Sequence, residues 1–415
     1  MSNPIPKNVP PISANPISVE GDGYRSAVKR TPFYAKMKEH DRVNQWHRWM
    51  DYTVPSVLEC PTLEYFAIRN SASVFDISPM SKYRIKGPDA LAFINRLVPR
   101  DMTKIKVGRV AYTVWCDDEG QVIDDGTIFR LADNDYRLCS QERQLEILKR
   151  NAVGFDVEFF EETDDVAALS FQGPVTCAIL KNMGLKDVEA LKLFDLGRFD
   201  FQGGEILISR TGFTGDLGYE LFISPDQADA LWDAIFEAGK NYNVRAIGGQ
   251  ALEMARIEAG FIQAGVDFMP STETVRPGHT RSPYELGLDW LVKLDKDCVF
   301  NGRRALLKEK EQGSRYRFVR LDVEGNKPAV NAYLFDKEDG KTIGATTCAT
   351  WAPSAKKNIA LGYVDMPHGK VGDTIWAEIF YQKELKWNRR WAKCIVVDGP
   401  FWDPPRKRLT PPTDF

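Results

Sequence analysis

The stretch Ser209-Arg210-Thr211-Gly212-Phe213-Thr214-Gly215-Asp216-Leu217-Gly218-Tyr219-Glu220-Leu221 is the most informative segment of this chain. It begins at the end of a predicted strand, Glu205–Ser209. Three glycines in so short a span allow the backbone to approach a ligand closely. Glu220 has two acceptor oxygens that match two parallel N–H donors, as on the edge of a pterin or a guanine. The alternative interpretation is an ordinary turn with a surface glutamate.

The segments around this stretch predict a mixture of helices and strands. Ser224-Pro225-Asp226 is a helix start signal, and a second helix is expected over Gln250–Gly260. Further towards the N-terminus, Tyr112, Val114 and Cys116 alternate as in a strand. The elements do not follow a regular strand–helix alternation, which favours an α+β fold.

Short strands separated by turns dominate the chain from about residue 316 and predict a small β-barrel or sandwich. The expected strands are Arg317–Val323, Ala332–Phe335, Ile359–Val364, Thr374–Phe380 and Trp391–Val397. The predicted division is an extended or flexible arm at residues 1–30, a first α+β region at 31–160, a second α+β domain at 161–315 and the β-barrel domain at 316–415.

The composition of the 415 residues excludes several classes of protein. Lys and Arg number 55 against 58 Asp and Glu, so no basic footprint for a nucleic acid is expected. No apolar run is long enough to span a bilayer, and the N-terminus lacks the apolar core of a signal peptide. Seven scattered cysteines fit a reducing compartment, which predicts a cytoplasmic protein. Four histidines without paired spacing predict no metal site. The signatures of Rossmann, P-loop, zincin and α/β-hydrolase proteins are absent from the sequence.

Two further segments carry chemically useful side chains. The segment Val122-Ile123-Asp124-Asp125-Gly126 is expected between two strands. The alternative interpretation is an ordinary turn, in which aspartates are common. In an extended backbone the two carboxylates point to opposite faces, so one of them can face a cavity. A partly buried carboxylate requires a partner, for which a ligand nitrogen would serve. The other segment, residues 282–294, contains Trp290. Its alternative interpretation is a strand with a packed tryptophan.

Together, and in this order, these segments resemble the glycine-cleavage T-protein (aminomethyltransferase) family. The resemblance runs from about Thr31 to Arg406 and is closer to the tetrahydrofolate-dependent demethylase branch, which includes dimethylsulfoniopropionate demethylase, than to T-protein proper. Its other matching segments are Val74–Met80, Arg100–Lys104, Phe171–Pro174, Arg256–Glu258 and Gly399–Trp402.

The resemblance implies a three-domain cloverleaf around a central folate channel, with tetrahydrofolate as the cofactor and residues 31–160 and 161–315 sharing the folate site. By position, Asp125 corresponds to the catalytic aspartate and Glu220 to the glutamate that holds the pterin edge. The remaining residues expected to bind the folate are Tyr112, Gln141, Phe194, Phe213 and Trp290.

Three departures from the family pattern bear on the reaction. Leu252 stands where the T-protein segment Gly-Ala-Arg-Asp has its arginine, Pro79 replaces a histidine, and Phe213 replaces a tyrosine. The segment that marks iron–sulfur assembly relatives is missing. These departures argue against the glycine-cleavage reaction and against docking of its lipoyl carrier.

The leading hypothesis is therefore methyl transfer from a small donor, a sulfonium, methylamine or methoxy compound, to N5 of tetrahydrofolate. Trp46, Trp49 and Tyr52 would supply an aromatic cage for a cationic donor, or they simply pack the N-terminal segment. One alternative is a true aminomethyltransferase that gives 5,10-methylene-tetrahydrofolate. Two others are a non-catalytic folate-binding protein and the folate half of an amine-oxidising enzyme whose flavin domain lies on another chain.

Overall fold

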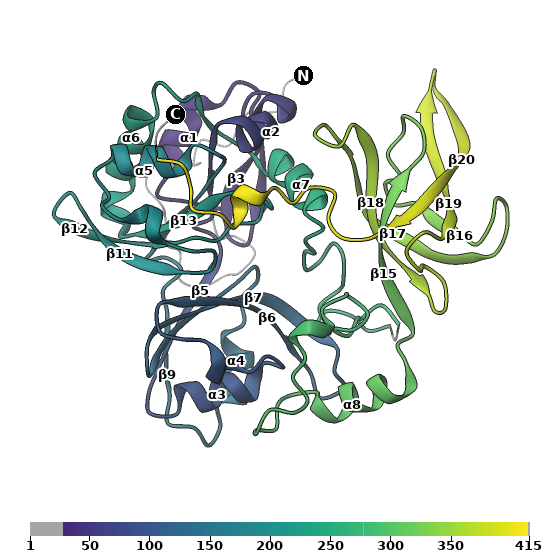
Figure 1. The fold of residues 1–415 in the computed structure, drawn as a ribbon, viewed down its shortest axis with the longest axis horizontal. Helices are drawn as coiled ribbons and strands as arrows, with labels where there is room; N and C mark the ends of the chain where they lie inside the picture. The colour runs from purple at the N-terminus through teal and green to yellow at the C-terminus, as the bar shows by residue number, and fades with distance from the viewer. Residues whose placement is uncertain (1–27, 277, 414–415) are drawn as a thin grey trace, which may run out of the picture.

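Three lobes make up the protein (Figure 1), as seen in a computed structural model that describes residues 28–276 and 278–413. Two lobes are sheets packed with helices, and the third is a barrel of C-terminal strands. The predicted α+β fold with a C-terminal barrel is thus confirmed. Most of the predicted arm, residues 1–27, lies outside the described residues. Among the helices of the described residues, none has the length and apolar character needed to cross a membrane.

The lower lobe in Figure 1 is a five-stranded antiparallel sheet in the order β6-β7-β8-β5-β9. Its elements are β5 (Ser81–Lys86), α3 (Ala90–Leu97), β6 (Arg109–Cys116), β7 (Val122–Ala132), β8 (Asp135–Ser140), α4 (Leu145–Asn151) and β9 (Glu158–Glu161). Trp115 is buried with the apolar residues of α3 and α4, whereas Val114 is buried in a different cluster. Both faces of β6 are therefore covered.

Strand β7 begins earlier than the sequence predicts. The acidic pair was expected between two strands, but the strand extends back to Val122 and includes both aspartates. In the register of the sheet, Asp124 pairs with Trp115 and Asp125 pairs with Val114. Because directly paired residues share a face, Asp124 faces α3 and α4 and Asp125 faces the opposite side.

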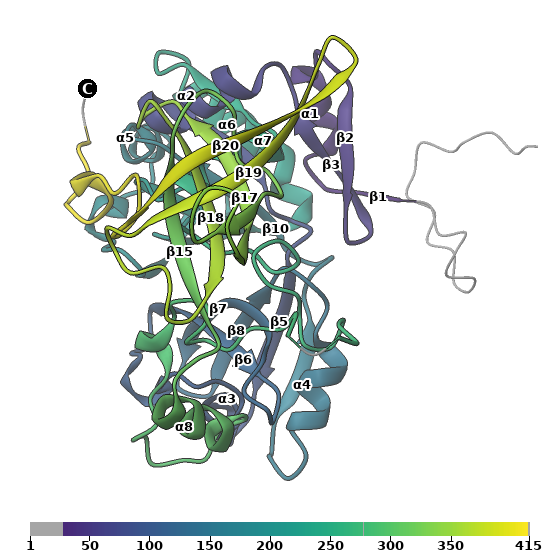
Figure 2. The same cartoon turned by 90° about the vertical axis from the view of Figure 1, so that its right-hand side faces the viewer.

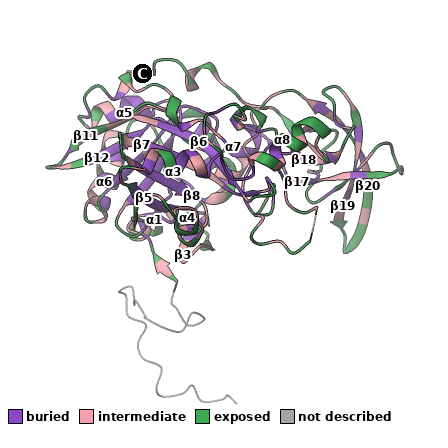
Figure 3. Ribbon diagram, turned by 90° about the horizontal axis from the view of Figure 1, so that it is seen from below, coloured by how far each residue is buried: buried purple, intermediate pink, exposed green. Residues whose placement is uncertain are grey.

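The upper left lobe in Figure 1 is a six-stranded sheet in the order β11-β12-β13-β10-β4-β14. Its strands are β4 (Ala72–Asp76), β10 (Ala167–Gln172), β11 (Leu196–Phe201), β12 (Gly204–Ser209), β13 (Gly218–Ile223) and β14 (Val244–Ala246). Its helices are α2 (Pro61–Asn70), α5 (Thr176–Asn182), α6 (Ala228–Ala238) and α7 (Gly249–Glu258). Strands β4 and β14 are parallel and the other pairs are antiparallel. Buried residues follow these strands in Figure 3.

A small N-terminal sheet packs beside this lobe. It contains β1 (Lys29–Arg30), β2 (Gln45–Trp49) and β3 (Tyr52–Val57), and helix α1 (Tyr34–His40) lies between its first two strands in the chain. Phe33 and Met37 are buried in the core of the six-stranded lobe. The residues that precede and include α1 therefore anchor this small sheet to its neighbour.

The C-terminal lobe is a closed barrel in the order β15-β18-β17-β16-β19-β20, seen face-on in Figure 2. Its strands are β15 (Tyr316–Val323), β16 (Tyr333–Phe335), β17 (Thr342–Ala352), β18 (Lys357–Asp365), β19 (Thr374–Lys383) and β20 (Lys386–Val397), and helix α8 (Arg303–Gln312) precedes them. Five of these strands are predicted from the sequence. Strand β17 is missed because its Gly344, Thr346 and Thr347 interrupt the apolar alternation.

The chain returns from the barrel to the six-stranded lobe, as the last part of the ribbon shows in Figure 1. There, Arg406 forms an ion pair with the fully buried Asp216, with 2.6 Å between Nε and Oδ1. Trp402 Nε1 donates to the same carboxylate at 2.9 Å. The C-terminal segment therefore completes the interior of a domain that lies far earlier in the sequence.

The short 3-10 helices are η1 (Met102–Lys104), η2 (Val188–Ala190), η3 (Pro225–Gln227), η4 (Asp289–Leu291) and η5 (Pro405–Lys407).

Candidate active site

Asp125 and Tyr112 form the centre of the candidate site. The phenol of Tyr112 on β6 donates a hydrogen bond to Asp125 Oδ2 on β7 at 2.9 Å. Both side chains are half-buried. They lie on the face of the sheet that points away from α3 and α4, as the register of β7 requires. Val114, on the same face, is buried with Ile262 and Leu291, so this face is turned towards the segment that follows α7.

Asp124, the other member of the acidic pair, is fully buried on the helix side. Gln144 Nε2, at the start of α4, donates to Asp124 Oδ2 at 2.9 Å. Both carboxylates are thus held by neutral donors. The sequence argument about opposite faces holds, with Asp124 on the helix side and Asp125 on the other face, and the role of Asp125 towards a ligand stays a prediction.

Burial raises the pKa of both carboxyl groups. Repulsion from Asp125 raises the pKa of Asp124 further. For Asp125, burial raises the pKa most, and the nearby charge of Asp267 raises it further. These two effects outweigh the hydrogen bond from Tyr112, which lowers the pKa. A carboxyl with a raised pKa can accept and release a proton near neutral pH, as general acid–base catalysis requires.

Asp267 is a neighbour that the sequence did not single out. Its carboxylate forms a fully buried ion pair with Arg256 of α7, with 2.6 Å between Oδ2 and Nη1. The matching segment Arg256–Glu258 drew attention to α7, but nothing in the spacing connected Asp267 to Asp125. Asp267 adds negative charge near Asp125 while remaining paired itself.

An aromatic surface adjoins Tyr112. The Trp290 ring, in η4, is stacked at 6.5 Å between centroids from the Tyr112 ring, and half of the Trp290 surface is exposed. The Arg100 guanidinium lies 5.6 Å from the Trp290 ring centroid and donates to the Tyr112 carbonyl at 2.6 Å. The sequence allowed a strand with a packed tryptophan here. The structure instead has a short 3-10 helix that leaves the ring accessible.

Glu220 lies on β13 and is half-buried. Thr211 Oγ1 donates to Glu220 Oε2 at 2.7 Å, and Ser209 and Thr211 share a hydrogen bond of 2.6 Å. Burial raises the pKa of Glu220, and the hydroxyls of Thr211 and Ser209 oppose that shift. The carboxylate is therefore oriented by hydroxyl donors at the end of the stretch in which the sequence placed it.

The glycines of that stretch allow close approaches within the protein. A Cβ at Gly212 or at Gly218 would lie 2.1 Å from Gln172 Oε1, and a Cβ at Gly215 would lie 2.4 Å from that of Ala259. Gly215 also has a φ of +72°. The close approach seen in the structure is to the Gln172 amide and to Ala259, and approach of a ligand to these glycines stays a prediction.

The other expected folate residues are spread around this region. Phe213 stacks on Phe261 at 5.8 Å between centroids, and Gln141 Nε2 donates to the carbonyl of Ala264 at 3.4 Å. Phe194 has a φ of +66°, and its backbone bridges the two sheets by bonding to Arg210 and Val110. These contacts define the position of each residue, and their roles towards a folate stay predictions.

The three aromatic residues of the expected cage have separate partners. Trp46 packs against Tyr34 and donates to Asp41 Oδ2 at 2.8 Å. Trp49 stacks near Phe75 at 6.5 Å between centroids. Tyr52 is buried and donates to Asp164. These contacts support the packing interpretation, and the cage stays a prediction.

Comparison with known proteins identifies the class. Residues 34–296 match the GCVT N-terminal domain family, and residues 317–403 match the glycine cleavage T-protein C-terminal barrel domain. The protein is thus an enzyme of a class of one-carbon transferases that use tetrahydrofolate as a substrate. The chain belongs to the glycine-cleavage T-protein family.

Its relatives include proteins of more than one name. The aminomethyltransferase of Halothermothrix orenii is 33% identical over 353 residues, which cover 84% of this chain and 95% of that protein. The trimethylamine-oxide aldolase of Ruegeria pomeroyi is 32% identical over 425 residues, covering 98% of this chain and 52% of that protein. The crystal structure of aminomethyltransferase T from Bartonella henselae has the same fold, with a TM-score of 0.79, 24% identity and coverage of 91% of this chain and 98% of that one.

Proposed function

We propose that this protein transfers a methyl group from a small methylated donor to N5 of tetrahydrofolate. The observation that carries the proposal is the Asp125–Tyr112 pair beside the accessible ring of Trp290. It combines a carboxyl whose pKa is raised with a flat aromatic surface. Aromatic faces suit a planar heterocycle, and the carboxyl suits a nitrogen that gains or loses a proton.

The residues present fit a reduced folate. Glu220 is a partly desolvated carboxylate, and such a group gains from two N–H donors of a pterin edge. Trp290 and Tyr112 would hold the flat ring, with Gln141, Phe194 and Phe213 completing the surroundings. The folate supplies the nitrogen that accepts the methyl group.

Asp125 would hold that nitrogen by a hydrogen bond and take up its proton. Tyr112 fixes the orientation of the carboxylate, because its phenol donates to Oδ2. Alignment of the acceptor nitrogen, the methyl carbon and the leaving atom is the main task, and positioning of this kind supplies up to about 7–11 kcal/mol of the barrier.

A demethylase is favoured over a glycine-cleavage enzyme by the surroundings of Leu252. In place of the family's arginine, the side chain packs in an apolar cluster that also contains Met80 and Phe194. Pro79, which directly precedes Met80 in the sequence, is buried where the family has a histidine. One relative is named for a methylated amine oxide, although this chain spans about half of its length. A sulfonium or quaternary ammonium donor that has lost its methyl group is a neutral molecule, so its departure needs no acid. No residue in the proposed mechanism serves as such an acid, and this favours an onium substrate.

The decisive test is an anaerobic incubation with tetrahydrofolate and a panel of sulfonium, methylamine, betaine and methoxyaromatic compounds, followed by mass analysis of the folate. We expect 5-methyl-tetrahydrofolate with one donor class. Formation of 5,10-methylene-tetrahydrofolate only, with an aminomethyl donor, would instead establish an aminomethyltransferase. Folate binding without any product would support a non-catalytic folate-binding protein.

A further inference from the structure

A pocket of about 330 Å³ lies on the C-terminal barrel, where strand β20 ends beside strand β15. Strand β15 pairs with β18 over its whole length but with β20 only over residues 320–323. The first half of β15 therefore has an open edge towards the pocket, and the loop of residues 369–371 and the last residues of β20 complete the walls. The volume is within the roughly 300–1,000 Å³ of sites for small ligands.

The charged side chains that line this barrel pocket are mostly basic. Arg317 and Arg320 come from β15 and Lys370 from the loop between β18 and β19, while Asp398 is the one acid among the lining residues. None of the four forms an ion pair within the part of the chain that the structure describes. The barrel pocket therefore carries positive charge that the protein itself does not neutralise, and such a pocket attracts anions.

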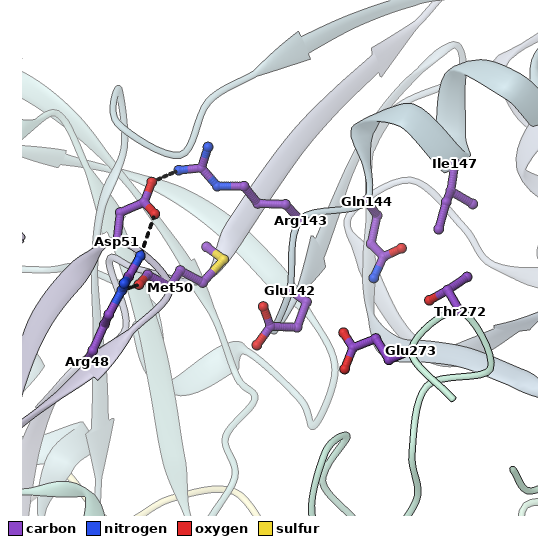
Figure 4. A pocket seen from close by; sticks show the side chains of 9 residues that line it. All are labelled: Arg48, Met50, Asp51, Glu142, Arg143, Gln144, Ile147, Thr272 and Glu273. Atoms are coloured by element: carbon purple, nitrogen blue, oxygen red, sulfur yellow. Dashed lines mark hydrogen bonds and ion pairs between the residues drawn. The ribbon is translucent and has the colours of Figure 1, made fainter. Parts of the chain in front are cut away.

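Another pocket of the protein, drawn in Figure 4, shows the usual arrangement of arginines. There, Arg48 and Arg143 both form ion pairs with Asp51. The charges of these two arginines are neutralised inside the protein, so they need no ligand. The barrel pocket differs because its arginines have no such acidic partner.

Arg320 is the cation that most lacks a partner. Its Nε is buried without a hydrogen bond, and its terminal nitrogens also have no partner among the described residues, although they are not fully buried. The guanidinium lies over the Phe318 ring at 5.4 Å and packs against Gly260, where a Cβ would lie 2.6 Å from Nε. Burial lowers the pKa of Arg320, and the charge of Asp398 opposes that shift only in part. A half-buried cation without a partner is costly, and an anion in the pocket would remove that cost.

We propose that the barrel pocket binds a small dicarboxylate, with one carboxylate on Arg320 and the other between Arg317 and Lys370. A guanidinium matches a carboxylate through two parallel hydrogen bonds. Arg317 and Arg320 are three residues apart in an extended strand, so they leave it on opposite faces. That arrangement favours two separated anionic groups over one compact ion such as phosphate. Phe318 and Val371 also line the pocket and suit an aliphatic chain between the carboxylates.

This chemistry has two sources, a free dicarboxylate and the glutamate that ends the tail of a folate. Phe318 connects the barrel pocket with the candidate active site, because it packs against the same apolar cluster of Val114 and Leu291 as Tyr112 does. The folate source rests on the proposed function, whereas the free dicarboxylate does not. The experiments are therefore arranged to separate the two.

The first measurement is isothermal titration calorimetry of the full chain at neutral pH, without folate. The probes are succinate, glutarate and adipate, which place two carboxylates at increasing separation. Acetate is the half-molecule and inorganic phosphate is the compact anion. We expect one dicarboxylate to bind at least about tenfold more tightly than acetate or phosphate, because it engages the cations on both faces of β15.

Arg320→Met keeps an apolar stem against Phe318 and removes the charge. It should weaken binding of the best dicarboxylate by about tenfold or more, the size expected for lost charged hydrogen bonds. Because Arg320 has no partner in the described protein, the urea midpoint of the variant should not fall, whereas a structural role would lower it. Arg143→Met is the matched control, since Arg143 lines the other pocket and is ion-paired, and it should leave the affinity unchanged.

The two sources are separated with tetrahydrofolate and with 6-methyl-tetrahydropterin, which has the ring system without the glutamate tail. If the tail occupies the barrel pocket, Arg320→Met weakens binding of tetrahydrofolate by about tenfold and leaves that of the tetrahydropterin unchanged. If a free dicarboxylate occupies it, the variant binds both of these compounds as the wild type does and loses only the dicarboxylate.

The proposal is overturned if no dicarboxylate binds with a Kd below about 10 mM and Arg320→Met also binds tetrahydrofolate as the wild type does. It is also overturned if acetate or phosphate binds as tightly as the best dicarboxylate, or if Arg320→Met binds every probe as tightly as Arg143→Met. All of these are binding measurements, so a failure to form 5-methyl-tetrahydrofolate would not affect them. A complete lack of folate binding would contradict the proposed function and leave the result with free dicarboxylates standing.

Discussion

Two groups of buried or half-buried carboxylates in this protein are held in opposite ways. One group, which we call the ion cluster, joins Glu258 and Asp216 to two arginines: Arg69 contacts Glu258 Oε2 at 2.8 Å and Arg406 contacts Asp216 Oδ1 at 2.6 Å. Each carboxylate of the ion cluster therefore has a guanidinium partner. In the acidic pair, Asp124 and Asp125 accept from the amide of Gln144 and the phenol of Tyr112. Guanidinium partners hold a carboxylate in place by charge-assisted hydrogen bonds, whereas in the acidic pair burial outweighs the neutral donors and raises the pKa of both carboxyl groups.

The comparison is tested most severely by removing the central cation of the ion cluster. Arg69→Met leaves Glu258 buried without its arginine, and breaking a buried pair in this way costs about 3–5 kcal/mol. We expect the free energy of unfolding to fall by that amount in urea titrations. Arg198→Met is the control, since its pair with Glu205 is exposed and should contribute less than about 1 kcal/mol. Equal losses in the two variants would mean that the cluster has no special structural role.

Asp125→Asn should have the opposite profile. With the carboxylate gone, we expect the rate of 5-methyl-tetrahydrofolate formation to fall by about 10²–10⁴-fold, the usual contribution of a positioned acid or base. Stability should stay within about 1 kcal/mol of the wild type, because the lost group has no cationic partner. Turnover and unfolding measured on the same preparation separate the two effects. An unchanged rate would remove Asp125 from the mechanism.

The pH dependence of stability gives a finer test. Burial and the neighbouring Asp125 raise the pKa of Asp124 in the folded state. A carboxyl of this kind binds its proton more tightly when folded, so stability falls as the pH rises from the unfolded value of about 4 through the raised folded pKa.

Asp124→Asn removes this loss. The stability of the variant relative to the wild type should therefore be greater at pH 8 than at pH 5, by about 1.4 kcal/mol for each pH unit of that range that lies below the raised folded pKa of Asp124. Chemical unfolding at the two pH values measures the difference. A relative stability that does not change with pH would show that Asp124 is not an uncompensated carboxyl.

The smallest effect is expected from Tyr112→Phe. The Tyr112 hydrogen bond lowers the pKa of Asp125, so its loss should move the acidic limb of the rate profile to higher pH by up to about one unit. The shift is read from initial rates across pH 5–9, with folding checked by circular dichroism. A fall in rate that is uniform with pH would assign Tyr112 to ligand packing instead.

Features that depend on neighbouring residues were predictable from the sequence. The start signal at Ser224-Pro225-Asp226 precedes α6, and the alternation of Tyr112, Val114 and Cys116 corresponds to β6. The opposite orientations of Asp124 and Asp125 follow from extended backbone alone. Membership of the glycine-cleavage T-protein family was predicted from the order of several matching segments, and the comparisons confirm this membership.

Features that depend on distant contacts were not predictable. The glycines at 212 and 218 are explained by Gln172, a residue of β10 that no local pattern connects with them. The position of Asp267 near Asp125 depends on the ion pair with Arg256, and the exposure of Trp290 depends on the turn that contains it. In each case the decisive partner is brought close only by the packing of the lobes.

The return of the C-terminal segment also sets an order in time. Asp216 and Arg406 are separated by 190 residues, which a ribosome takes about 10–40 s to synthesise. Once β14 has been made, the six-stranded lobe has all of its strands, but Asp216 still lacks Arg406 and has only the longer contact, 3.5 Å, with Arg69. The six-stranded lobe, whose strands are made before the barrel, is thus completed only after the barrel, and a newly made chain passes through a period in which this interior lacks the contacts of Arg406 and Trp402.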